Sequence, residues 1–206
     1  WDFRQVPTSL RALNGIIDIA GDSRGNVWFG TLDNGMALFN PREKTCRSFT
    51  YDPKNSDGIQ SNVIRVIHED SRGNIWVGTH GGGLSRFHPG QNSFTTYRQE
   101  DGLPGNSVFG ILEDEDGYLW LSTNRGLGKF NPKIEEFNSF SQSEGFLNTA
   151  FHPYAYHRDP DGKMFFGGSH GLIRFHPRDI VPNRYVPPVV LTGFYLFNRR
   201  VNTGSS

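Results

Sequence analysis

The sequence predicts an all-β protein built from β-propeller blades that form a partial ring. Four copies of one repeat follow each other, each with an apolar strand, an Asp-x-x-Gly turn, an apolar–aromatic pair and a Gly-apolar segment that ends in Phe. The apolar–aromatic pairs recur at spacings of 48, 44 and 45 residues: Val27-Trp28, Ile75-Trp76, Leu119-Trp120 and Met164-Phe165. A period of roughly 40–50 residues that contains only strand and turn signals is typical of propeller blades.

The second copy shows how one repeat makes one blade. A strand rich in β-branched residues is expected over Val63–Asp70, and Asn74–Thr79 is expected to form the second strand. Between them, the side chain of Asp70 can accept hydrogen bonds from backbone N–H groups, and Gly73 can supply the positive φ that closes the turn. The third and fourth strands are expected at Leu84–Phe87 and Ser93–Tyr97. Four antiparallel strands then complete the blade.

The Asp-x-x-Gly turn recurs in every copy, at Asp22–Gly25, Asp114–Gly117 and Asp159–Gly162 as well. The run Asp114-Glu115-Asp116-Gly117 could be interpreted as a set of calcium ligands. However, copies without the second carboxylate carry the same turn, which favours hairpin chemistry. The aromatic residue that follows each turn is expected to pack between blades, with a platform for ligand stacking as the alternative.

Three parts are expected along the chain. Residues 1–15 should hold the last strand of a preceding blade and a linker, because Trp1–Arg4 aligns with Thr95–Arg98. Residues 16–182 should form the four propeller repeats. Residues 183–206 should contain a linker and the truncated start of a β-sandwich. This organisation suggests a piece of a longer protein, whose free sheet edges and inter-blade faces should favour self-association.

The composition excludes several function classes. Lys+Arg and Asp+Glu are both 21, so the balance of charge gives no support to a nucleic-acid partner or an acidic membrane. No apolar run reaches the length of a membrane span, so contact with a membrane would need a helix outside this sequence. The single Cys46 excludes a disulfide framework and a cysteine-rich zinc site.

No catalytic residue, cofactor or metal site is predicted. Residues 167–171 match the G-x-S-x-G pattern of hydrolases, but that pattern requires a strand-to-helix turn, and here it lies between two strands. The seven histidines show no H-E-x-x-H spacing, and the glycine runs lack the Lys-Ser/Thr of a phosphate loop.

Loops at one rim of the ring are the predicted ligand site. The loop between the second and third strands of each blade should lie on the same face as the connection to the next blade. These loops differ in side chain from copy to copy, as a site for an asymmetric ligand requires. The candidate ligand-binding residues are Asp33, His80, Asn124, Arg125 and His170. Three asparagines that recur before the first strand are expected to cap turns instead: Asn62, Asn106 and Asn148.

The repeat resembles the two-component regulator propeller repeat. The resemblance is nearly position by position over Asp70–Pro89, and it is close over Asp22–Pro41 and Asp114–Pro132. Asn148–Pro177 is similar to the terminal repeat of that family. The run Pro187–Thr192 is similar to the opening of the triple-tyrosine (Y_Y_Y) β-sandwich domain that follows such propellers.

The resemblance implies a periplasmic sensor that is not itself an enzyme. In that family, the propeller and sandwich belong to an inner-membrane receptor whose output is a histidine kinase, a hybrid kinase with a response regulator, or a diguanylate cyclase. Several members recognise oligosaccharides, so an oligosaccharide or another small ligand is the expected partner, with a homodimer in the parent receptor. The alternatives are a propeller-based polysaccharide lyase or hydrolase, and a protein-docking propeller.

Overall fold

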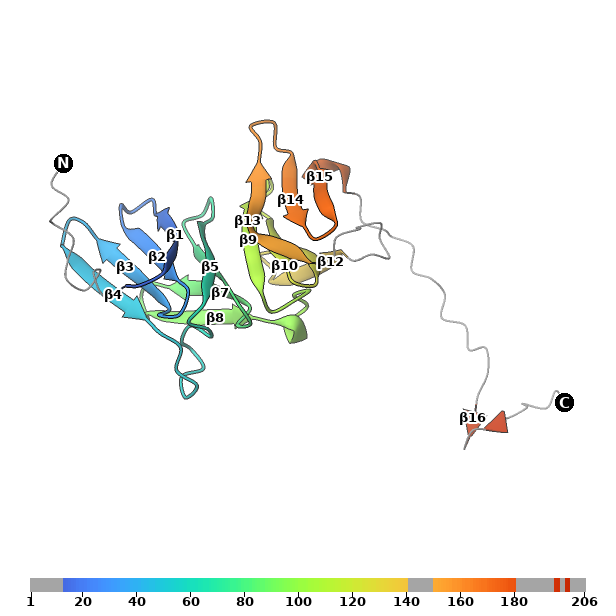
Figure 1. The fold of residues 1–206 in the computed structure, drawn as a ribbon, viewed down its shortest axis with the longest axis horizontal. Helices are drawn as coiled ribbons and strands as arrows, with labels where there is room; N and C mark the ends of the chain where they lie inside the picture. The colour runs from blue at the N-terminus through green and yellow to red at the C-terminus, as the bar shows by residue number, and fades with distance from the viewer. Residues whose placement is uncertain (1–12, 141–149, 181–194, 197–198, 201–206) are drawn as a thin grey trace.

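The computed structural model describes residues 13–140, 150–180, 195–196 and 199–200 of the chain. Figure 1 shows the sheets following one another along the sequence, from blue to orange. Each of the first three sheets is a four-stranded meander, and the fourth has three strands within the described residues. The predicted strand at Trp1–Arg4, the cap at Asn148 and the sandwich opening at Pro187–Thr192 lie outside the described residues.

Strand bounds follow the repeat. The first blade contains β1 (Ile16–Gly21), β2 (Val27–Thr31), β3 (Met36–Asn40) and β4 (Thr45–Phe49); the second contains β5 (Ile64–Glu69), β6 (Ile75–Thr79), β7 (Leu84–His88) and β8 (Ser93–Tyr97). The third contains β9 (Val108–Glu113), β10 (Leu119–Thr123), β11 (Gly126–Asn131) and β12 (Glu136–Phe140); the fourth contains β13 (Phe151–Arg158), β14 (Met164–Gly168) and β15 (Gly171–Phe175). Two short 3-10 helices (Gln99–Asp101, Pro177–Asp179) and the strand pair β16 (Tyr195–Leu196) and β17 (Arg199–Arg200) complete the described elements.

The first strands of the blades pack side by side, β1 on β5, β5 on β9 and β9 on β13. Consecutive antiparallel strands within each sheet, with neighbouring sheets packed face to face, are the architecture of propeller blades. The predicted all-β propeller fold is therefore confirmed, with four blades in the described residues.

The turn aspartate has the structural role that the repeat predicts. In the second blade, one carboxylate oxygen of Asp70 accepts hydrogen bonds from the backbone N–H groups of Arg72 and Asn74, at 3.0 and 2.9 Å. The other oxygen accepts one from Trp76 Nε1 at 2.8 Å. Gly73 takes a φ of 78°, in the left-handed region that favours glycine. Asp114 makes the equivalent bonds in the third blade, so its turn is a hairpin.

The tryptophans after these turns are the packing residues between blades. Trp28, Trp76 and Trp120 are at most 1% exposed. Each ring packs against a phenylalanine of the third strand of the next blade, and the centroid distances are 5.0 Å for Trp28–Phe87, 5.4 Å for Trp76–Phe130 and 4.8 Å for Trp120–Phe175. Each packed aromatic pair stabilises the folded protein by about 0.5–1.5 kcal/mol in addition to the contribution from the buried area.

Phe165 departs from the prediction that the fourth copy buries its aromatic residue equally. It occupies the tryptophan position in register, because it pairs with His157 and Arg174 as Trp76 pairs with His68 and Arg86. Phe165 is nevertheless only half-buried, whereas the next residue, Phe166, is fully buried. The reason is that the tryptophan position faces the next blade, and no further blade follows in the described residues.

The first and last blades expose apolar side chains at positions that are buried in the inner blades. Leu172 in the last blade is 66% exposed, whereas its equivalents Met36, Leu84 and Leu127 are 0% exposed. In the first blade, Ile19 is 62% exposed, while Ile67 and Ile111 at the same position are 6% and 2% exposed. These two surfaces, named here the end faces, have the chemistry of a blade-to-blade contact.

A polar latch joins successive blades at the Asp-x-x-Gly turns. The serine after the turn aspartate donates both its backbone N–H (2.7 Å) and its Oγ (2.6 Å) to a glutamate at the end of the first strand of the next blade. The pairs are Ser23–Glu69 and Ser71–Glu113. At the third junction the partners change to Glu115 and Arg158, whose charged atoms are 3.8 Å apart.

Candidate functional site

The rim loops contain all five predicted ligand-binding residues, and each of these residues is exposed. Because the strands run antiparallel in sequence order, the loops β2–β3, β6–β7, β10–β11 and β14–β15 lie at the same end of the blades as the connections between blades. The sequence therefore placed these residues on one face correctly.

Two of the five residues are joined through a serine of the connection between the second and third blades. The ring of His80 lies 3.3 Å from Ser107 Oγ through Nδ1, and the backbone N–H of Gly81 donates to the same hydroxyl at 3.1 Å. The backbone N–H of Ser107 donates to Asn124 Oδ1 at 3.2 Å. Ser107 is buried, so it holds His80 and Asn124 in a defined arrangement while their own side chains remain exposed.

The other three residues lie on the β2–β3, β10–β11 and β14–β15 loops. Asp33 accepts a hydrogen bond from its neighbour Asn34 at 2.6 Å. Arg125 follows Asn124 on the β10–β11 loop, and its backbone N–H donates to Thr123 Oγ1 at 3.1 Å. His170 lies on the β14–β15 loop of the last blade. The hydrogen-bonded network of His80, Ser107 and Asn124 therefore lies on the second and third blades.

Two of the three predicted asparagine caps are confirmed. Asn62 Oδ1 accepts a hydrogen bond from the backbone N–H of Tyr51 at 2.7 Å, and Asn106 Oδ1 accepts one from Gln99 at 2.9 Å. The backbone carbonyls of both asparagines accept from glycines of the β2–β3 and β6–β7 loops. These side chains therefore shape the connections between blades.

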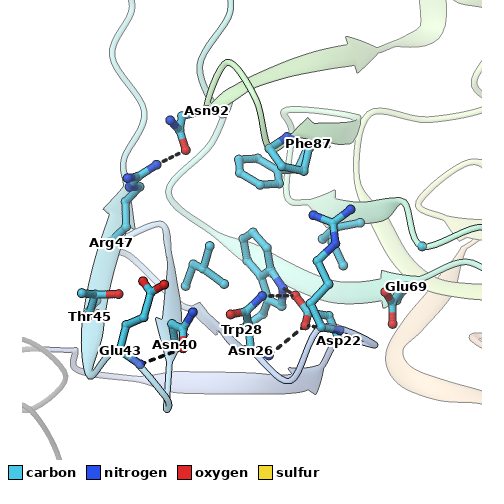
Figure 2. A pocket seen from close by; sticks show the side chains of 16 residues that line it. Asp22, Asn26, Trp28, Asn40, Glu43, Thr45, Arg47, Glu69, Phe87 and Asn92 are labelled. Carbon is cyan, nitrogen blue, oxygen red and sulfur yellow. Dashed lines mark hydrogen bonds between the residues drawn. The ribbon is translucent and has the colours of Figure 1, made fainter.

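A hollow that the sequence did not reveal lies between the first and second blades, on the opposite face from the rim loops. It has a volume of about 400 Å³ and opens near the turns β1–β2 and β3–β4 (Figure 2). The residues that line it are Asp22, Arg24, Asn26, Trp28, Leu38, Asn40, Glu43, Thr45, Cys46, Arg47, Glu69, Gly73, Ile75, Phe87, Pro89 and Asn92. This space, named here the junction pocket, is within the size range of small-molecule sites.

The first strands of the first and fourth blades each carry a partly buried titratable group whose pKa is raised. Asp18 of β1 accepts a hydrogen bond from the backbone N–H of Ile67 at 2.6 Å, and burial raises the pKa of its carboxyl. Burial, with a smaller contribution from the charge of Asp18, raises the pKa of Tyr156 of β13 to about 12.

The described ranges contain no group of three His, Cys, Asp or Glu side chains that could hold a metal ion. Within the same ranges, no helix has the length and hydropathy of a membrane span.

Comparison with protein families gives a specific match. Residues 12–33, 58–81 and 102–125 match the family model described as two component regulator propeller. A histidine kinase, P4, of Formosa agariphila is 34% identical over 187 residues. These residues make up 89% of this chain but only 13% of the kinase.

Solved structures agree with this match. The extracellular domain of a hybrid two-component system from Bacteroides thetaiotaomicron superimposes with a TM-score of 0.74 and 29% identity. The superposition covers 92% of this chain and 26% of that domain, so the chain spans about a quarter of its length. Virginiamycin B lyase from Staphylococcus aureus shares the fold alone, with a TM-score of 0.56 and 16% identity over 82% of this chain and 57% of the lyase.

Proposed function

The chain carries repeats of the two-component regulator propeller family, and we therefore propose that it is part of the sensing module of a bacterial two-component receptor. The observation that carries this proposal is the match to an extracellular domain of a hybrid two-component system over 92% of the chain. The histidine kinase relative supports it independently. Both relatives are signalling proteins, and one is matched within an extracellular domain, which supports a non-catalytic role.

An extracytoplasmic location follows from the same relatives. In the full receptor, the propeller would be periplasmic, followed by a triple-tyrosine sandwich and a membrane helix, and it would act as a homodimer. Sequencing of the parent gene beyond Ser206 tests this part: a completed sandwich, one membrane span and a kinase or cyclase are expected. An enzyme domain with no membrane span would contradict it.

Ligand recognition is proposed at the rim, around the His80–Ser107–Asn124 network and the neighbouring Arg125. These side chains offer donors to hydroxyl or carboxylate oxygens, as an oligosaccharide would present. The neutral net charge makes nonspecific electrostatic capture weak, so recognition must rest on local groups of this kind. Protein docking at the rim is the alternative that the same exposed groups would serve.

Calorimetry of the complete ectodomain against a panel of oligosaccharides tests the rim site. His80→Ala and Arg125→Ala should each weaken binding by about 1.5–3 kcal/mol, the range for a charge-assisted hydrogen bond. Arg42→Ala, which removes an exposed arginine on the opposite face, should leave the affinity unchanged. A bound oligosaccharide whose affinity neither rim variant alters would place the site elsewhere.

A further inference from the structure

The junction pocket exists because one side chain differs between blades. In the second blade, Arg86 pairs with Trp76 across β6 and β7, and its guanidinium carbon lies 5.8 Å from the centroid of the indole ring. Arg86 Nη2 also donates to Asn74 Oδ1 at 2.8 Å. A cationic head group therefore fills the space beside the tryptophan and satisfies the amide oxygen next to the turn.

The third blade repeats the arrangement with a lysine. Lys129 pairs with Trp120 in the same register, and its Nζ lies 5.2 Å from the Trp120 ring and 4.0 Å from the Tyr118 ring. The same ammonium is 3.9 Å from the turn carboxylate of Asp114. Two successive blades thus place a positive charge at one position, between an aromatic ring and the acceptors of the turn.

The first blade has a leucine at this position. Leu38 pairs with Trp28 in the register that Arg86 and Lys129 occupy in their blades, but its side chain is short and uncharged. Asn26, the equivalent of Asn74, donates through Nδ2 to Asp22 at 2.9 Å, and its Oδ1 accepts no described hydrogen bond. Among the described residues, no charged side chain therefore takes the place of the cationic head group in the first blade, and Asn26 Oδ1 has no hydrogen-bond partner among them.

Side chains of both signs of charge line the pocket. The carboxylate of Asp22 and the amide of Asn26, both half-buried, line it together with the apolar side chains of Leu38 and Phe87. The lining also contains two exposed arginines, Arg24 and Arg47, and two further carboxylates, Glu43 and Glu69. The carboxylate of Glu69 already accepts two hydrogen bonds from Ser23. Arg47 reaches across the junction to the amide of Asn92 (Figure 2), whereas the guanidinium of Arg24 makes no hydrogen bond or ion pair among the described residues.

We propose that the junction pocket binds a free basic amino acid of the size of arginine or lysine. The side-chain cation of the ligand takes the position that Arg86 and Lys129 occupy in the later blades, next to Asn26 Oδ1 and Asp22. Its carboxylate then meets the guanidinium of Arg24, which also lines the pocket. Trp28 is only 1% exposed, so the acceptors rather than the ring face carry the recognition. This site is separate from the rim and deepens the proposed sensing function by naming a second ligand class.

Calorimetry of the chain with three related probes tests the two charged contacts of the pocket. Arginine should bind, agmatine lacks the carboxylate, and norvaline lacks the guanidinium. Each truncated probe should bind at least about tenfold more weakly than arginine, since each loses one charged contact of roughly 1.4 kcal/mol or more. Equal binding of all three probes, or no binding of arginine, would overturn the proposal.

Leu38→Arg should recreate in the first blade the arrangement of the second and abolish arginine binding. Thr50→Arg, which adds the same charge at an exposed position outside the pocket, should leave binding unchanged. As a milder variant, Arg24→Ala should weaken arginine about tenfold but leave agmatine unaffected. Undiminished arginine binding by a folded Leu38→Arg or Arg24→Ala protein would contradict the site. Oligosaccharide binding at the rim should be insensitive to both variants, so the two proposals can fail separately.

Discussion

At the scale of single residues, the turn aspartates allow large aromatic rings to be buried. An indole N–H that is removed from water without a partner is costly, by about 1–3 kcal/mol. Asp22, Asp70 and Asp114 each accept the N–H of the tryptophan six residues later, at 2.8–3.0 Å. Burial by itself would raise the pKa of Asp70, but hydrogen bonds from Trp76, Asn74 and the turn backbone outweigh it and lower that pKa.

Asp70→Ala should therefore destabilise the protein by about 2–4 kcal/mol, because it leaves the Trp76 indole and two backbone N–H groups unpaired. Asp159→Ala is the matched control. The carboxylate of Asp159 accepts a hydrogen bond from the backbone N–H of Lys163, but the ring of the equivalent aromatic residue, Phe165, has no N–H to donate. The loss of unfolding free energy caused by Asp159→Ala should be at least about 1 kcal/mol smaller than the loss caused by Asp70→Ala. Urea denaturation of both variants measures the difference, and equal losses would argue against the role given to the indole bond.

His68 makes stability depend on pH. It lies opposite Trp76 in the sheet, and burial lowers its pKa below the ordinary 6.5 despite the nearby carboxylates of Glu113, Asp70 and Glu69. Below about pH 6.5, the unfolded chain binds a proton that the folded chain resists. The free energy of unfolding should thus fall as pH is lowered from 6.5 to the lower folded pKa, and should be level above about pH 7.

The third blade supplies the control for this prediction, because Leu112 occupies the position of His68. His68→Leu should flatten the pH dependence of the unfolding free energy between pH 7 and 5. Denaturant titrations at several pH values in this range measure it. If the slope persists in the variant, other groups cause it.

At the scale of the secondary-structure elements, the blades are joined by the latches as well as by apolar packing. Each serine latch uses two short hydrogen bonds to one carboxylate, whose partner strand begins the next blade. Bonds to a charged acceptor are stronger than neutral ones, although exposure of the serine reduces their net contribution. At the third junction, Glu115 bonds Arg178 as well as facing Arg158.

A double-mutant cycle with Ser71→Ala and Glu113→Gln should give a coupling free energy of about 1 kcal/mol. The same cycle on Glu115 and Arg158 should give no more than about 0.5 kcal/mol, since their charged atoms are 3.8 Å apart and Glu115 is exposed. Thermal or urea unfolding measures both cycles. A larger coupling for the charged pair would contradict this ranking.

The elements were largely predictable from sequence, because turn chemistry and strand alternation repeat in every copy. The second blade was expected at Val63–Tyr97 and observed from β5 to β8, with first-strand bounds that differ by one residue. The junction pocket could not be predicted, since it depends on Leu38 facing a neighbouring blade in the register of Arg86. The link between His80 and Asn124 likewise needs Ser107, from a separate connection. Phe165 was misjudged because burial at its position requires a further blade.

At the scale of the whole molecule, the two end faces are complementary halves of one contact. The last blade presents Leu172 and Phe165 where inner blades bury Leu84 and Trp76, and the first blade presents Ile19 where Ile67 is buried. A surface of this kind on one copy can dock on the opposite end of another. Such a contact is head-to-tail, so it extends into chains of molecules unless the ring closes.

The isolated chain should therefore self-associate with increasing concentration, as sedimentation velocity can show. Leu172→Glu should reduce this association, because it places a charge in the apolar contact. Ile134→Glu is the control, since Ile134 is 60% exposed but lies between β11 and β12, outside the end faces. A compact monomer at all concentrations would mean that the four blades close by themselves.

The changed latch at the third junction has a consequence for how the repeats find their places during folding. A protein built from similar repeats can misfold when two blades that are not neighbours in the sequence pack against each other. A third blade placed against a second copy of itself would bring Glu113 beside Glu115, two carboxylates at one latch, whereas Arg158 of the fourth blade offers the opposite charge. The change from a serine–glutamate latch to the Glu115–Arg158 pair thus distinguishes the last blade from the others. It also disfavours a ring with the blades in the wrong order, because that order would place two carboxylates together.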